Sequence, residues 1–180
     1  MRNEAERIWL REGVQLRWHR ASDVLDAARV LRLEIVDEYA GSAAAHAEYA
    51  LGDFRPSVGT VRVSLSSAAQ ATAAGLSSLL RPQQPFDYPL ALGCVLGRAI
   101  AHEIGHGLLG PAHSRSGLMQ PAFKPSHLVD RQSARFQLTS EDAANLYQHL
   151  GDGQVALRVR APATTPSDSE PADDADALAR

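Results

Sequence analysis

The sequence lacks the features that would assign it to a secreted or membrane class. It has one cysteine among 180 residues, so no intrachain disulfide can form and bridges do not reveal the redox compartment. The longest candidate membrane span, residues 89–101, is interrupted by Arg98 and is shorter than the roughly 20 residues that a bilayer core requires. The first residues, through Trp9, include charges but no apolar core and no cleavage site, so they do not predict a signal peptide. We expect a cytoplasmic protein if the sequence is complete, and a secreted one if an upstream signal is missing.

Most of the chain also has almost no net charge. The net charge is -3, but residues 161–180 hold five acidic side chains against Arg180, so the first 160 residues sum to +1. Such a body offers no electrostatic surface for nucleic acid or for an anionic membrane. The last twenty residues are rich in Pro, Ala, Ser, Thr and Asp without apolar periodicity, which predicts disorder. We therefore expect one domain over residues 1–160 and a disordered acidic tail over 161–180.

Apolar periodicity predicts alternating helices and strands before the centre of the chain. Ala5, Ile8 and Trp9 form a helical stripe within residues 3–11, and strict alternation predicts strands at 13–18, 31–36 and 61–65. Further helices are expected at residues 24–30, 43–51 and 68–80, and residues 52–59 are expected to be a connection.

The region from Leu90 to Leu109 is apolar on nearly all sides, which is typical of a central buried helix. Thr139 or Ser140 is expected to cap a terminal helix that ends near Leu150. The predicted fold is α+β: a small twisted mixed sheet packed on a central active-site helix, with a short C-terminal subdomain that ends in a helix. On the central helix, Cys94 is expected to be a small buried residue. Arg98 is expected to reach the surface rather than to orient a carboxylate near the site.

The central helix contains the motif His102-Glu103-Ile104-Gly105-His106. Residues four apart lie above one another on a helix, so His102 and His106 can both reach one metal ion. Glu103 is rotated by about 100° from His102, beside the metal, where its carboxylate can take a proton from water. The motif predicts two zinc ligands and a general base.

A catalytic zinc site needs a third protein ligand and an open fourth position. His113 is the nearest candidate, and Gly110 with Pro111 is suited to ending the helix and reversing the chain. Acidic residues Asp130 and Glu141 are the alternatives for this third position.

With these residues the chain resembles the metzincin zinc metallopeptidases. Their pattern is a His-Glu-x-x-His helix, a turning Gly, a third His and a Met in a tight turn, here matched by Gly110, His113 and Met119. The resemblance implies zinc as cofactor, peptide or protein substrates, and Met119 as an apolar floor that does not coordinate the metal. This chain has three residues between the second His and the Gly, where the family has two.

The resemblance extends loosely over about 150 residues, and the family's edge strand pairs with substrate. The family also has a first strand that should precede the first helix. Its absence suggests that Met1 lies inside the native domain and that an upstream strand, with or without an export signal, is missing.

Two other functions fit parts of the pattern. Ala101 to His106 also resembles the helix of intracellular peptidases that cleave repressor proteins, and in that case a later acidic residue such as Glu141 would be the third ligand. The other alternative is a non-catalytic binding module that zinc merely stabilises. In the main hypothesis the chain is a zinc-dependent endopeptidase with His102, His106 and His113 as ligands and Glu103 as general base.

Overall fold

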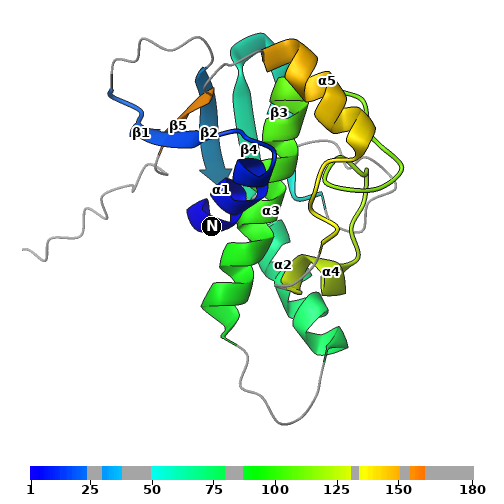
Figure 1. The fold of residues 1–180 in the computed structure, drawn as a ribbon. Coiled ribbons are helices and arrows are strands. Elements are labelled where there is room, and N and C mark those ends of the chain that lie inside the picture. The colour runs from blue at the N-terminus through cyan, green and yellow to red at the C-terminus, as the bar shows by residue number, and fades with distance from the viewer. Residues whose placement is uncertain (24–29, 38–49, 80–86, 131–133, 151–154, 161–180) are drawn as a thin grey trace, which may run out of the picture.

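A computed structural model describes residues 1–23, 30–37, 50–79, 87–130, 134–150 and 155–160. The fold is α+β, as predicted, with one mixed sheet packed on a central helix (Figure 1). The helices are α1 (Arg2–Arg11), α2 (Leu65–Ser78), α3 (Tyr88–Leu109), α4 (Pro125–Val129) and α5 (Ser140–Leu150). Within the described ranges, no helix combines the length and the hydropathy needed to cross a membrane.

The sheet has five strands in the order β1-β5-β2-β4-β3. They are β1 (Leu16–Arg20), β2 (Val30–Val36), β3 (Gly52–Arg55), β4 (Thr60–Ser64) and β5 (Val155–Arg160). All neighbouring pairs are parallel except β3 with β4, which is antiparallel. A short 3-10 helix, η1 (Pro56–Val58), connects β3 with β4. The antiparallel strand β3 therefore forms one edge of the sheet.

The central helix α3 begins and ends where its sequence dictates. The Asp87 side chain accepts a hydrogen bond from the backbone N–H of Leu90 at 3.1 Å, and Pro89 lies in the first turn, where its missing N–H is not needed. The helix ends at Gly110, whose φ of 95° is accessible to glycine. These signals place a 22-residue helix through the middle of the molecule.

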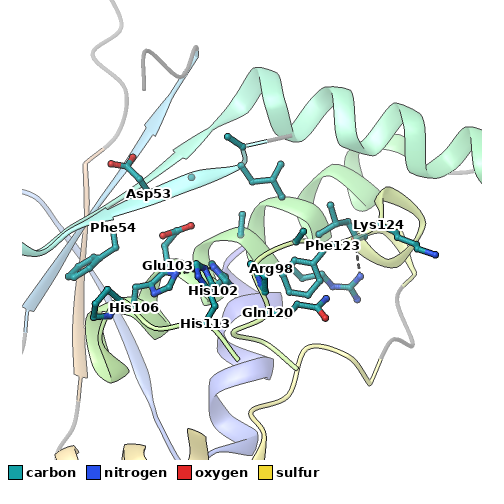
Figure 2. Close-up of a pocket in the computed structure, with 18 of the residues that line it drawn as sticks. Asp53, Phe54, Arg98, His102, Glu103, His106, His113, Gln120, Phe123 and Lys124 are labelled. Carbon is teal, nitrogen blue, oxygen red and sulfur yellow. Dashed lines mark hydrogen bonds between the residues drawn. The ribbon is translucent and has the colours of Figure 1, made fainter. Parts of the chain in front are cut away.

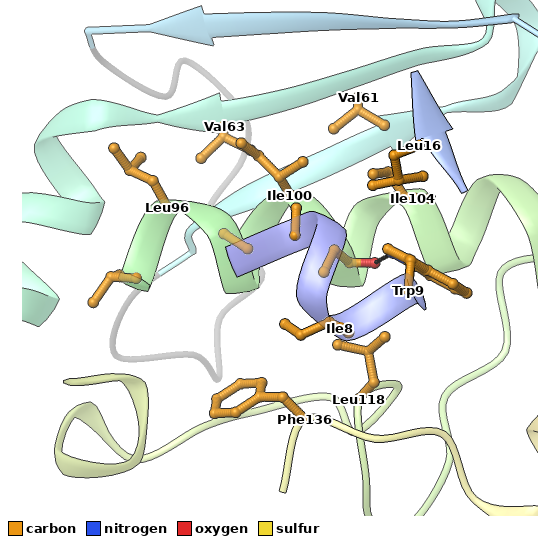
Figure 3. Close-up of a cluster of buried hydrophobic side chains, with 14 of the residues drawn as sticks. Ile8, Trp9, Leu16, Val61, Val63, Leu96, Ile100, Ile104, Leu118 and Phe136 are labelled. Atoms are coloured by element: carbon orange, nitrogen blue, oxygen red, sulfur yellow. Dashed lines mark hydrogen bonds between the residues drawn. The ribbon is translucent and has the colours of Figure 1, made fainter. Parts of the chain in front are cut away.

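The core joins α1, α3 and the sheet into one body. Figure 3 shows Ile8 and Trp9 of α1 packed on α3, with Val61 of β4 on the other side of that helix. Trp9 is fully buried, and its Nε1 donates a hydrogen bond to the backbone carbonyl of Ala101 at 3.2 Å. Ala101 directly precedes His102, so the core fixes the helix at the point where the histidines begin.

Several predicted elements agree with the structure, whereas two strands, one short α-helix and the 3-10 helix η1 of the described residues were not predicted. The predicted helix at 3–11 and the strands at 31–36 and 61–65 match α1, β2 and β4 closely, whereas β1 starts later than expected. The assignment of residues 52–59 to a connection is wrong, because β3 occupies Gly52–Arg55. The short helix α4 and the strand β5 were also missed. The helices expected at 24–30 and 43–51 and the tail at 161–180 lie outside the described residues, apart from residues 30, 50 and 51.

Strand β5 comes late in the sequence but lies between β1 and β2 in the sheet. It follows α5 and pairs in parallel with β1 on one side and with β2 on the other. The resemblance suggested a missing strand before the first helix. In the structure, an interior position of the sheet is held by a strand that comes after the last helix.

Arg98 is buried on α3, so the prediction of a surface side chain is wrong. Its Nε donates to the Glu4 carboxylate of α1 at 2.8 Å, and its Nη1 donates to the backbone carbonyls of His127 and Leu128, each at 2.8 Å. The guanidinium also lies over the ring of Phe136, 4.3 Å from its centre. These partners come from distant parts of the sequence, and together they compensate the buried charge. Arg98 thereby ties α1, α3 and α4 together.

Replacing Arg98 with methionine is expected to lower the free energy of unfolding by about 3 kcal/mol, because two carbonyls and a carboxylate lose their buried donor. Urea denaturation at neutral pH measures the change. Arg7→Met is the matched control, since Arg7 pairs with the same Glu4 but is 35% exposed. Its expected cost is below about 1 kcal/mol. Equal losses in the two variants would contradict the buried role of Arg98.

Candidate metal centre

Three histidines converge at the C-terminal half of α3. His102 and His106 project from neighbouring turns of the helix, and His113 returns from the following loop (Figure 2). One nitrogen from each of them lies within 4.8 Å of the others. The Nε2 atoms of His102 and His106 are 3.1 Å apart. Two ligands of a tetrahedral zinc ion are separated by about 3.4 Å, so the spacing suits a single ion.

Hydrogen bonds set the tautomers of the two helical histidines. Nδ1 of His102 is 2.7 Å from the carbonyl oxygen of Leu118, and Nδ1 of His106 is 3.0 Å from that of Gly110. A carbonyl oxygen can only accept, so both Nδ1 atoms must carry the proton. The two Nε2 atoms then face each other with lone pairs and no hydrogen between them. Such an arrangement is repulsive by itself and is favourable around a cation, so these residues fit a metal ion.

The loop that carries His113 accommodates the extra residue before the glycine. The helix closes with a bond from the Gly110 N–H to the His106 carbonyl, and the chain then turns away at the positive φ of Gly110. The His113 ring lies 4.7 Å from that of His106 and 5.4 Å from that of His102, measured between ring centres. The unusual spacing therefore still brings His113 to the group.

Burial keeps the helical imidazoles neutral. It lowers the pKa of His102 to about 4, against the opposing effect of the Leu118 carbonyl. Burial also lowers the pKa of His106, with a further contribution from His113. A metal binds the unprotonated imidazole, so these two ligands are ready to bind near neutral pH.

Glu103 lies beside the histidines in a water-poor position. Only 7% of its surface is exposed. Burial raises the pKa of its carboxyl to about 8, and the negative charge of Asp53 adds to the increase. Figure 2 shows Asp53 of β3 on the other side of the Glu103 carboxylate from His102 and His113. A carboxyl group whose pKa lies near neutrality is suited to both accepting and returning a proton.

Gly52 allows β3 to approach this carboxylate. A Cβ atom at Gly52 would lie 2.4 Å from the carbonyl oxygen of Arg62 and 3.2 Å from the Glu103 Cγ. A side chain at this position would collide with the backbone of β4 and would also crowd Glu103, so glycine favours the close packing of β3 here. Gly52 and Asp53 were not predicted to belong to the site, because four residues followed by Pro56 show no clear strand pattern.

Met119 lies beneath the motif and is buried. A Cβ atom at Gly105 would be 2.2 Å from the Met119 sulfur, so the glycine between the two histidines permits this close packing. Leu118, the residue before it, supplies the carbonyl that binds His102. The turn thus supports α3 both by packing and by a hydrogen bond.

The three histidines open into a cavity of about 860 Å³. One wall is β3, and the opposite wall is the segment that contains Gln120 and Phe123. Glu103 and Arg98 also line this space. A cavity of this size is within the range of pockets that bind ligands.

The alternative acidic ligands are not part of the histidine group. Among the described residues, the group that could hold a metal ion consists of His102, His106 and His113 and includes neither Asp130 nor Glu141. Both acidic residues are exposed. Glu141 lies in the first turn of α5, where its charge favours the helix.

Comparisons of the chain with protein-family models, with curated proteins and with solved structures found no match. Any function must therefore be argued from the site itself.

Proposed function

We propose that the protein is a zinc-dependent endopeptidase similar in its site to the metzincins. The observation that carries the proposal is the pair of Nε2 lone pairs on His102 and His106, 3.1 Å apart, with His113 beside them and the buried Glu103 next in sequence. Three imidazoles with one adjacent carboxylate are the set that a hydrolytic zinc site uses. His102, His106 and His113 would hold the metal.

Glu103 performs the proton transfers in this proposal. Zinc, when bound, supplies a Lewis acid that polarises the scissile carbonyl and makes water more acidic. The Glu103 carboxylate takes a proton from the attacking water as its oxygen bonds to the carbonyl carbon. Glu103 then gives this proton to the nitrogen of the leaving amine as the C–N bond breaks.

The sheet edge beside the cavity favours an extended peptide as substrate. Strand β3 pairs with β4 on one side, and its residues Gly52, Asp53 and Phe54 line the cavity. A sheet edge presents backbone N–H and C=O groups that can pair with another extended chain. A peptide bound there would place its backbone across the histidines.

Metal content and cleavage of peptides test this proposal. The purified chain, reconstituted with zinc, is expected to retain about one ion per chain. It should cleave members of a broad peptide library, as read by mass spectrometry.

His113→Ala should weaken zinc binding, whereas Glu141→Ala should retain it. Metal loss in Glu141→Ala with full retention in His113→Ala would instead support an acidic third ligand. Zinc binding without any cleavage would support a binding module.

A further inference from the structure

Ser114, the residue after His113, is tied to the start of α5. Its hydroxyl lies 2.6 Å from one oxygen of the Asp142 carboxylate and 2.8 Å from the other. A carboxylate can only accept, so Ser114 donates, and the short distance is typical of a charge-assisted bond. The contact joins two segments 28 residues apart in the sequence.

Asp142 also belongs to the N-terminal cap of α5. The Thr139 hydroxyl accepts from the Asp142 N–H at 3.1 Å, and the Asp142 carboxylate accepts from the Thr139 hydroxyl at 2.7 Å and from its N–H at 3.4 Å. This is a capping box with aspartate in the third position of the helix. The cap would be complete without Ser114, so the bond to the serine is an additional function of the carboxylate.

The hydrogen bond from Ser114 to Asp142 holds the loop that contains His113. The Ser114 N–H donates to the Met119 carbonyl at 2.9 Å, which closes the turn beneath α3. His102 and His106 are each oriented by a carbonyl, from Leu118 and Gly110. Within the described part of the chain, no hydrogen bond holds the exposed ring of His113. Its position therefore depends on how firmly its loop is anchored.

We propose that Asp142 is a positioning residue for the third metal ligand, acting through the Ser114 hydroxyl. This inference rests on the proposed metal centre. The Asp142 carboxylate, held at the capped end of α5, is a fixed and negatively charged acceptor for the Ser114 hydroxyl. This bond restrains the backbone at Ser114 and thereby the position of the adjacent His113. Outer residues that orient ligands in this way contribute to metal affinity without touching the ion.

Zinc affinity of the full chain, measured by competition with a chromophoric chelator, tests the proposal. Ser114→Ala is expected to bind zinc about 10-fold to 100-fold more weakly than the wild type. Ser114→Thr keeps a hydroxyl and should restore most of the affinity. The visible absorption of the cobalt-substituted protein should change in Ser114→Ala and return in Ser114→Thr, which a general loss of stability would not produce.

Thr139→Ala separates the anchor from the helix cap. It removes the cap but leaves Ser114 and Asp142 intact, so it should lower the melting temperature and change zinc affinity less than Ser114→Ala does. Equal zinc affinity in Ser114→Ala and wild type, or no recovery in Ser114→Thr, would overturn the proposal while leaving the metal centre standing. Absence of zinc binding in the wild type would overturn the metal centre itself.

Discussion

Replacing Glu103 with glutamine is expected to lower kcat/KM for peptide cleavage by about 10³-fold or more, while zinc remains bound. Glutamine has nearly the same shape, so it can occupy the buried position beside β3 without opening a cavity. Its amide cannot take a proton from water or return one to the leaving amine. In the proposed site the three histidines hold the zinc, so zinc affinity should stay within about threefold of the wild-type value. Steady-state kinetics on one identified peptide and metal analysis of the same sample provide both measurements.

Glu141→Gln is the matched control for this variant, because it makes the same chemical change at an exposed carboxylate of α5. Its activity should equal that of the wild type. If Glu103→Gln cleaved peptides as fast as the wild-type chain, the general-base role would be wrong. If it lost both activity and zinc, Glu103 would be needed for metal binding, and the proposed division of roles would fail.

Local sequence signals were sufficient for most of the helical part of the site. The spacing of His102 and His106 defines one face of a helix, and helix geometry alone then places Glu103 beside that face. His113 could be proposed because Gly110 and Pro111 end the helix within a few residues. Each of these inferences depends on contacts close in sequence. The structure groups the same three histidines.

The features that were missed depend on contacts between distant segments. The burial of Arg98 depends on hydrogen bonds to Glu4 of α1 and to backbone carbonyls of α4. The sequence around residue 98 contains no pattern that predicts these partners. The close packing at Gly52 involves the Arg62 backbone of β4 and the Glu103 side chain of α3, and the sequence near Gly52 does not reveal either neighbour. Periodicity describes one element at a time, so it could not predict these pairs.

The position of strand β5 in the sheet also could not be predicted from periodicity. Val155, Leu157 and Val159 occupy alternate positions, which is a local signal for a strand, although no strand was predicted here. The position between β1 and β2 could not follow from that alternation. It depends on parallel pairing with two strands near the other end of the chain, and the choice among several sheet positions is a property of the whole fold.

A chain that ends at residue 150 is expected to lose most of its stability, because it lacks β5. The strand pairs along five residues with β1 and along five with β2. Its removal leaves the facing backbone groups of both neighbours without these partners and detaches β1 from the sheet. With each net hydrogen bond contributing about 0.5 to 1.5 kcal/mol, the loss is comparable to the whole stability of a typical domain, about 5 to 15 kcal/mol. Urea denaturation followed by circular dichroism should show no cooperative transition.

A chain that ends at residue 160 is the control, because it keeps β5 and lacks only residues 161–180. We expect it to unfold at the same urea concentration as the full chain. The same transition midpoint in the 150-residue chain would show that β5 contributes nothing to the fold. If the shorter chain is unfolded as expected, it should also lose zinc affinity, because α3 packs on strands of the same sheet and the histidines on α3 depend on that packing. The last strand of the chain would then be as necessary to the metal centre as the helix that carries its ligands.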